Sequence, residues 1–265
     1  MLDDLTGFAA FVFNFEMLST WGYRLLLGLQ ITAEVVLISC TLGFLLAYPL
    51  SRARMSKNPL LSWPVLGYVS FFRGTPLLCQ LYLVYYGAGE MRPFLTEIGI
   101  WWFFRDAFYC CIFAFTLNTA AYQSEILRGA VQSVPAGQIE AARSLGLSPY
   151  RIARHVVWPQ AMLIALRPLG NELIGIIKAS ALAAIVTLLD LMGQTRFVFA
   201  RTFDFSIYLY AAIIYLAITQ AISKLWNWLE KQLSRHMHIA PPATMLLGAA
   251  DRGAASATLG AVQAE

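Results

Sequence analysis

Five apolar segments of this chain are each about as long as a lipid bilayer is thick, and they limit the folds that it can adopt. An α-helix crosses the hydrocarbon core with roughly 20 apolar residues, and hydrophobic residues make up 58% of the chain. Charged residues make up only 13%, against roughly 25% in soluble domains. The sequence therefore predicts an all-α membrane protein with about five transmembrane helices, near residues 25–50, 62–88, 107–127, 160–188 and 206–228.

Basic residues gather on one side of the predicted membrane. Eleven Lys and Arg residues fall in the segments 51–60, 125–167 and 224–238, and five fall in the opposite loops or before the first span. Because cytoplasmic loops carry the excess of Lys and Arg, we expect those three segments in the cytoplasm. The N-terminus is then outside and the C-terminus is cytoplasmic. The net charge of +4 follows from this topology, so we expect no nucleic-acid partner.

The composition changes near residue 239 to Ala, Gly, Pro, Ser and Thr. A segment of this kind buries too little apolar surface to form a core. We therefore expect one transmembrane domain over residues 1–238 and a flexible cytoplasmic tail over residues 239–265. The four cysteines lie in apolar segments without CxxC or Cys/His spacing, so we expect no metal site.

The second apolar segment is interrupted by the run Arg73-Gly74-Thr75-Pro76. Thr followed by Pro is typical of a helix start, so we expect Thr75 as the N-cap and Pro76 as the first helical residue. A helix that begins inside a membrane presents free N–H groups and the positive end of its dipole. Arg73 and Thr75 are therefore candidates for an anion site. The alternative is that Arg73 is a cytoplasmic anchor that sets the topology.

The segment 133–159 predicts two short helices in the cytoplasm. Pro135 suits the first turn of one helix, and Gly146 suits the left-handed residue that ends it. Ser148-Pro149 is typical of the start of a second helix, which we expect to stop at Pro159.

The first of these helices carries small side chains and one acid. Ala136, Gly137, Ala141 and Ala142 permit close approach by another protein, and Glu140 offers a charge to it. An ordinary amphipathic connector on the membrane surface is the alternative that the residues alone leave open.

Several motifs resemble those of bacterial ABC-importer permeases for polar amino acids, in the order of that family and over about residues 20–230. They are Phe72-Arg73-Gly74-Thr75-Pro76, the run from Asn118 to Ala130, Glu140-Ala141-Ala142 with Gly146 and a later Pro159, Leu169-Gly170-Asn171-Glu172-Leu173-Ile174, and Lys178-Ala179-Ser180-Ala181-Leu182. Within the family, the chain is most similar to the M-type subunits of histidine/lysine-arginine-ornithine and opine permeases. One departure from the family pattern is Val156 and Trp158, where the family loop more often has Ile and Leu.

The resemblance implies the type I ABC-importer permease fold in a bacterial inner membrane. It implies that Glu140, Ala141, Ala142, Gly146 and Pro159 couple the chain to an ATPase. Residues 133–159 are therefore called the coupling loop below. The implied partners are two ATP-binding subunits, a second related permease that makes a heterodimer, and a periplasmic amino-acid-binding protein. The chain has no G-x4-GK[ST] loop, so we expect ATP and Mg²⁺ on the partners and no cofactor or enzymatic activity here.

An amino-acid substrate brings an ammonium and a carboxylate, so its path needs charges of both signs. Glu172 lies well inside the fourth span, where a carboxylate is costly unless it meets a cation or water, and it is the first candidate for the ammonium. Pairing with Arg167 or Lys178 is the structural alternative for Glu172. Weaker or alternative candidates along the path are Asn171, Lys178, Glu34, Arg73, Thr75, Asn118, Thr119, Tyr122 and Glu125.

The expected function is therefore a permease subunit for histidine, arginine, lysine, ornithine or opines that forms half of a translocation pore. The same machine for glutamine, glutamate/aspartate or cystine is the alternative within this class. From other classes, an ion-gradient-driven carrier and a non-transporting membrane scaffold stay as distant alternatives.

Overall fold

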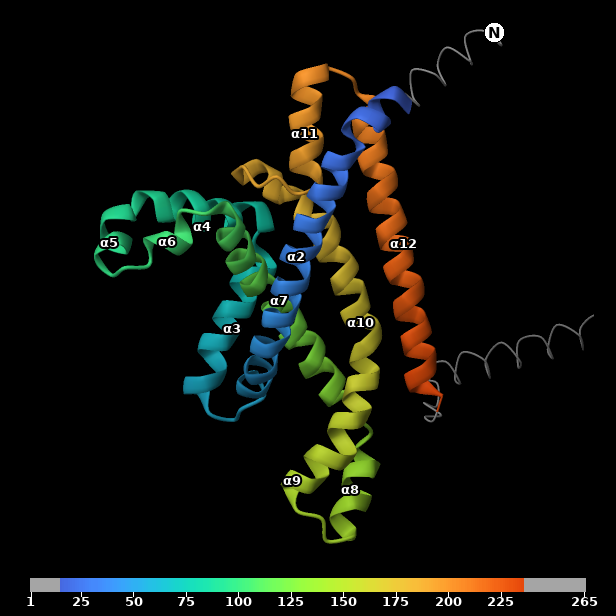
Figure 1. Cartoon of the computed structure of the whole chain (residues 1–265). Helices are drawn as coiled ribbons and strands as arrows, with labels where there is room; N and C mark the ends of the chain where they lie inside the picture. Colours follow the sequence, from blue (N-terminus) through green and yellow to red (C-terminus); the bar gives the residue numbers. More distant parts are fainter. Residues whose placement is uncertain (1–14, 236–265) are drawn as a thin grey trace, which may run out of the picture. The chain divides into compact units, whose positions relative to one another are not determined.

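The computed structural model describes residues 15–235, and in that range nearly every residue is helical and no strand occurs (Figure 1). The predicted all-α fold class is confirmed. The predicted tail over 239–265 lies outside the described residues. The elements are α2 (Phe15–Arg54), α3 (Pro59–Gly74), α4 (Leu77–Glu90), α5 (Arg92–Glu97), α6 (Trp101–Phe104), α7 (Ala107–Gln132), α8 (Ala136–Ser144), α9 (Pro149–Ile152), a π-helical turn (Ala153–Val157), α10 (Trp158–Ala179), a 3₁₀ segment (Ser180–Val186), α11 (Leu191–Thr202) and α12 (Ser206–Ser234).

Three helical stretches within the described range are long and apolar enough to cross a membrane: Glu16–Arg54, Pro149–Val186 and Ser206–Ser234. The 26 residues of α7 also exceed the roughly 20 that a crossing needs. By contrast, α3 has 16 residues and α4 has 14, so neither crosses alone. The count of five spans and their orientation stay predictions.

The main core lies where α2 packs along α7 and where α4, α10 and the 3₁₀ segment close over them. Because lipid tails are as apolar as Leu, helices in a membrane associate through close packing and interhelical hydrogen bonds. Gly43 of α2 meets this need, since a Cβ there would overlap the methyl group of Thr119 on α7. The largest fully buried side chain of this core is Phe115.

The predicted break between α3 and α4 is present, but one residue later than expected. Pro76 is the N-cap and α4 begins at Leu77. The expectation that Thr75 caps this helix was wrong, because its hydroxyl donates to the carbonyl of Phe71 at 2.8 Å. Thr75 therefore closes α3 rather than opening α4.

The coupling loop also differs from the prediction at one point. Ser148 caps α9, its hydroxyl accepting from the N–H of Arg151 at 3.4 Å, as its sequence suggests. The helix does not stop at Pro159, however. It passes through a π-helical turn, and Pro159 is the second residue of α10. Because the helix is continuous here, Pro159 cannot donate to the preceding turn, and the π-helical turn Ala153–Val157 directly precedes α10.

Indole packing joins α12 to α10. The carbonyl of Leu166 on α10 accepts a hydrogen bond of 2.7 Å from Trp226 Nε1 on α12. The indole lies against Gly170, where any Cβ would overlap its ring. A glycine is therefore needed at the point where the two helices meet.

A second close approach joins α2 to the start of α11. Asp190 caps α11 by accepting from the N–H of Gly193 at 2.8 Å, and the N–H of Leu191 donates to Thr32 Oγ1 at 3.0 Å. Gly28 packs directly on this backbone, and a Cβ there would lie 2.7 Å from the carbonyl oxygen of Asp190.

We expect Gly28→Ala to lower the melting temperature of the purified protein in detergent. The clash is with backbone, so the helices must separate, which costs about 1–3 kcal/mol. Gly67→Ala is the matched control, because Gly67 is helical with open space around it and alanine there should keep or raise the melting temperature. Equal melting temperatures for Gly28→Ala and the unchanged protein would contradict the close approach.

Candidate functional site

One face of α10 is polar and exposed along its length. Arg167, Asn171, Gly175 and Lys178 are all exposed, at the three- and four-residue spacing of one helix face. Polar groups that face hydrocarbon are costly, and in membrane proteins they face protein or water. This face of α10 therefore suits an aqueous path or another protein and does not suit lipid.

Glu172 borders this polar face and is half-buried against α7. Its Oε1 accepts a hydrogen bond of 3.2 Å from Thr119 Oγ1, and the positive charge of Arg73 is within electrostatic reach. The structure thus brings together Thr119 of α7 and Glu172 of α10. A carboxylate held by one neutral hydroxyl keeps acceptor capacity for a cation.

Two other candidates lie apart from Glu172. Lys178 borders a hollow of about 310 Å³ that is lined mostly by apolar and aromatic side chains, among them Met192 and Tyr208. Glu34 is exposed on α2 and accepts from Gln30 Nε2 at 2.8 Å. The structure gives neither residue a contact with the Thr119–Glu172 pair.

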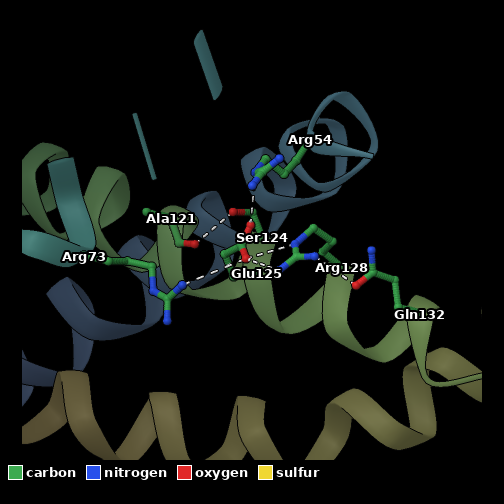
Figure 2. A network of polar contacts seen from close by, with 7 residues as sticks. All are labelled: Arg54, Arg73, Ala121, Ser124, Glu125, Arg128 and Gln132. Atoms are coloured by element: carbon green, nitrogen blue, oxygen red, sulfur yellow. Dashed lines mark hydrogen bonds and ion pairs between the residues drawn. The ribbon is translucent and has the colours of Figure 1, made fainter. Parts of the chain in front are cut away.

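Three guanidinium groups converge on one carboxylate, that of Glu125 (Figure 2). Arg128 donates to Glu125 Oε2 from Nη2 at 2.6 Å and from Nε at 2.9 Å. Arg54 Nε lies 3.8 Å from Oε1, and Arg73 Nη1 lies 4.0 Å from Oε2. We call Arg54, Arg73, Glu125 and Arg128 the arginine cluster. It joins the ends of α2 and α3 to α7.

Arg73 also lies over the ring of Tyr122, 5.3 Å from its centroid. Arg73, Tyr122 and the cluster carboxylate border a hollow of about 470 Å³, whose opposite wall is Ile164 and Pro168 of α10. Arg73 and Tyr122, both predicted as path residues, thus border one cavity. Arg54 and Arg128 were missed as candidates, because their basic character was fully explained by topology.

Asn118 and Thr75 take part in a network of structural hydrogen bonds. Asn118 Nδ2 donates to Gln80 Oε1 at 2.9 Å, and Gln80 Nε2 donates to the carbonyls of Phe72 and Thr75 at 2.9 and 3.1 Å. These bonds satisfy the carbonyls freed by the break between α3 and α4. The importance of Gln80 was missed, although a glutamine in an apolar run was a signal for it.

The coupling loop presents a small, exposed helix. Glu140 and Ala141 of α8 are exposed, Ala142 is buried beneath them, and Gly146 has a φ of 74°, which confirms its predicted left-handed conformation. Behind α8, a hollow of about 430 Å³ lies between Gly146 and the π-helical turn. The exposed face is free of large side chains over Ala136 and Gly137.

A pair of amides ties α8 to α10. Gln160 Nε2 donates to Gln138 Oε1 and to the carbonyl of Val156, the latter at 3.0 Å. Neither glutamine was predicted to take part. This contact joins α8 to the start of the helix that carries Glu172.

No group of His, Cys, Asp and Glu within the described part of the chain could hold a metal ion.

Comparisons with known proteins identify relatives of this chain. A family described as "Binding-protein-dependent transport system inner membrane component" matches residues 39–238. The nopaline transport system permease protein NocM of Agrobacterium fabrum is 41% identical, over 81% of this chain and 89% of its own. The histidine/lysine/arginine/ornithine transport system permease protein HisM of Escherichia coli K12 is 36% identical, over 83% of this chain and 93% of its own.

A solved structure has the same fold. The "Crystal structure of an amino acid ABC transporter with histidines" matches with a TM-score of 0.73 and 32% sequence identity, covering 81% of this chain and 96% of that one.

We expect Asn118→Leu and Gln80→Leu to destabilise the protein by about 1–3 kcal/mol each, because each leaves buried partners without a hydrogen bond. The double variant should be less destabilised than the sum of the two, by about 0.5–3 kcal/mol, since both act on one network. Thermal unfolding of the four proteins in detergent measures this coupling. Strictly additive effects would show that the two amides do not act together.

Proposed function

Since this chain belongs to the family of binding-protein-dependent transport system inner membrane components, we propose that it is a permease subunit of an ATP-driven importer for basic amino acids or opines. In this proposal it lies in the inner membrane and forms half of a pore with a second, related permease. A periplasmic binding protein delivers the substrate. Two ATP-binding subunits in the cytoplasm hold ATP and Mg²⁺.

The observation that carries the proposal is the polar, exposed face of α10 beside Glu172. In a chain with 58% hydrophobic residues, a line of Arg167, Asn171, Gly175 and Lys178 is unsuited to lipid. Such a face is suited to a water-filled path between two subunits. The exposed face of α2, by contrast, is lined by leucines such as Leu26, Leu37 and Leu45.

Glu172 supplies the preference for cations. Its carboxylate is half-buried and has Thr119 as its hydrogen-bond donor. An ammonium or guanidinium that replaced water there would gain a charge-assisted bond, and removal of such a bond costs roughly 1.5–3 kcal/mol. The side chain of a neutral or acidic substrate gains nothing from this group, whereas a cationic side chain can pair with it. The position of Glu172 therefore favours histidine, lysine, arginine, ornithine or an opine over glutamine, glutamate/aspartate and cystine.

Coupling to the ATPase is assigned to α8 with its exposed Glu140. The path from this helix to the pore is short. Gln138 of α8 contacts Gln160 of α10, and Glu172 is twelve residues further along α10, or about 18 Å at 1.5 Å per residue. Movement of the docked α8 is thus transmitted as movement of the substrate-binding helix.

We expect Glu172→Gln to reduce ATP-driven uptake of labelled arginine by roughly tenfold or more, because it removes the negative charge and keeps the shape. The measurement uses proteoliposomes with the complete importer and unlabelled competitors. Lysine, ornithine or an opine should compete, whereas glutamine and glutamate should not. Glu97→Gln is the matched control, because Glu97 is an exposed residue of α5 outside the site. Full uptake by Glu172→Gln would rule out its role.

We expect Glu140→Lys to abolish uptake while the chain still inserts, because the reversed charge faces the docked ATPase subunit. Co-purification of the ATPase subunit and stimulation of its ATP turnover are the measurements. Glu97→Lys carries the same substitution on α5 and should transport normally. Normal coupling by Glu140→Lys would refute the docking role of α8, and uptake without ATP would favour an ion-gradient-driven carrier.

A further inference from the structure

The face of α2 that packs on α7 carries a row of small residues. Ser39, Gly43 and Ala47 follow one another at four-residue spacing, and all three are buried. Small residues of this kind let two helix backbones approach closely in a membrane. On either side of Gly43 the row accommodates a Cβ, because Ser39 and Ala47 each carry one. What a side chain would meet at position 43 itself therefore explains the glycine there.

The atom in the way at position 43 is the methyl group of Thr119 on α7. A Cβ on Gly43 would overlap Thr119 Cγ2. The nearest backbone atoms are further away, with the amide nitrogen of Ala120 at 3.3 Å and the carbonyl oxygen of Thr116 at 3.5 Å from that Cβ. A small shift would relieve the backbone contacts, whereas the methyl group would have to move out of its place. Gly43 is thus matched to the side chain of Thr119.

The hydroxyl of the same side chain is directed at another helix. Thr119 is fully buried, and its Oγ1 donates to Glu172 Oε1 on α10 at 3.2 Å. A helical threonine can instead donate to a carbonyl of its own preceding turn. Thr41, Thr195 and Thr219 do so, at 2.7, 2.7 and 2.8 Å. The bond from Thr119 to Glu172 therefore depends on which rotamer this side chain adopts.

One torsion angle places both groups of Thr119. Its methyl and hydroxyl are carried by the same Cβ, and χ1 of a β-branched residue takes only a few staggered values. A rotation that moved the methyl group away from Gly43 would also turn the hydroxyl away from Glu172. The space that Gly43 leaves on α2 is thereby linked to a hydrogen bond between α7 and α10.

We propose that Gly43 is a positioning residue of the substrate path, because the space it leaves holds Thr119 in the rotamer whose hydroxyl fixes the carboxylate of Glu172. This inference rests on the proposed function and adds to it a residue of a third helix. A carboxylate that is already fixed loses less conformational freedom when a cationic side chain binds to it. Gly43 touches no substrate and acts only through Thr119.

Binding of arginine and of citrulline to the purified membrane complex of permease and ATPase subunits tests the inference. The two probes have nearly the same shape, but citrulline carries a neutral ureido group where arginine carries its guanidinium. The ratio of their affinities reports the pairing with Glu172, whereas a general loss of structure weakens both alike. We expect the unchanged complex to prefer arginine by about tenfold or more, and Gly43→Ala to lower this preference by about fivefold.

Rescue by a second substitution locates the effect at Thr119. Serine keeps the hydroxyl and lacks the methyl group that the new Cβ would meet. The double variant Gly43→Ala/Thr119→Ser should therefore prefer arginine to within about twofold of Thr119→Ser alone. Thr119→Val keeps a methyl group beside Gly43 and removes only the hydroxyl, so its preference for arginine should fall as in Gly43→Ala. This variant tests the hydroxyl without any new side chain at position 43.

Gly28→Ala is the matched control on the same helix. Its new methyl group would meet the backbone of Asp190 and Leu191 and not Thr119. It should lower the melting temperature and leave the ratio of arginine to citrulline affinity unchanged, which separates positioning of Thr119 from loosened packing of α2.

An unchanged ratio in Gly43→Ala or in Thr119→Val would overturn the inference. Failure of the double variant to fold or to recover the preference would assign Gly43 to helix packing alone and overturn it too. Glu172→Gln distinguishes these results from failure of the proposed function. Loss of the preference in Glu172→Gln, with the preference kept in Gly43→Ala, overturns only the positioning role. An unchanged complex that binds no arginine, or does not prefer it to citrulline, overturns both.

Discussion

The polar face of α7 is the constraint on which the positions of the other helices depend. Asn118 binds the broken segment through Gln80, Thr119 binds Glu172 of α10, and Glu125 gathers arginines from α2 and α3. Each polar group would be costly in hydrocarbon without its partner. Because lipid supplies no hydrophobic force between helices, these contacts and the close packing at Gly43 fix the arrangement.

In the proposed function, α10 connects two tasks of a permease, coupling to the ATPase and binding the substrate. Its start is tied to the coupling helix α8 through Gln160, and its middle carries Glu172 beside an exposed polar face. The π-helical turn before it is a locally wider stretch of the kind that often occurs at functional sites. Trp226 holds α10 from the other side at Gly170. Motion of α10 is therefore guided by a contact at its start and another near its middle.

Local signals in the sequence were sufficient to predict apolar helices, the break near Gly74 and the left-handed conformation of Gly146. They failed where a rule has two outcomes: Thr75 before Pro76 closes one helix instead of opening the next, and Pro159 continues a helix instead of ending it. Hydrogen-bond and ion-pair partners that are distant in the sequence could not be predicted from local patterns. Nothing near Glu172 in the chain indicates Thr119, and the role of Arg54 in the arginine cluster depends on how the helices pack.

The interrupted segment has a consequence for how the protein is made. At 16 and 14 residues, α3 and α4 are each too short to partition into the bilayer as an independent span. The carbonyls at their junction are satisfied by Gln80, which is in turn held by Asn118. That asparagine leaves the ribosome later than the segment it stabilises. Biogenesis therefore has an order: the segment 59–90 acquires its final position only once α7 has been synthesised and has packed beside it.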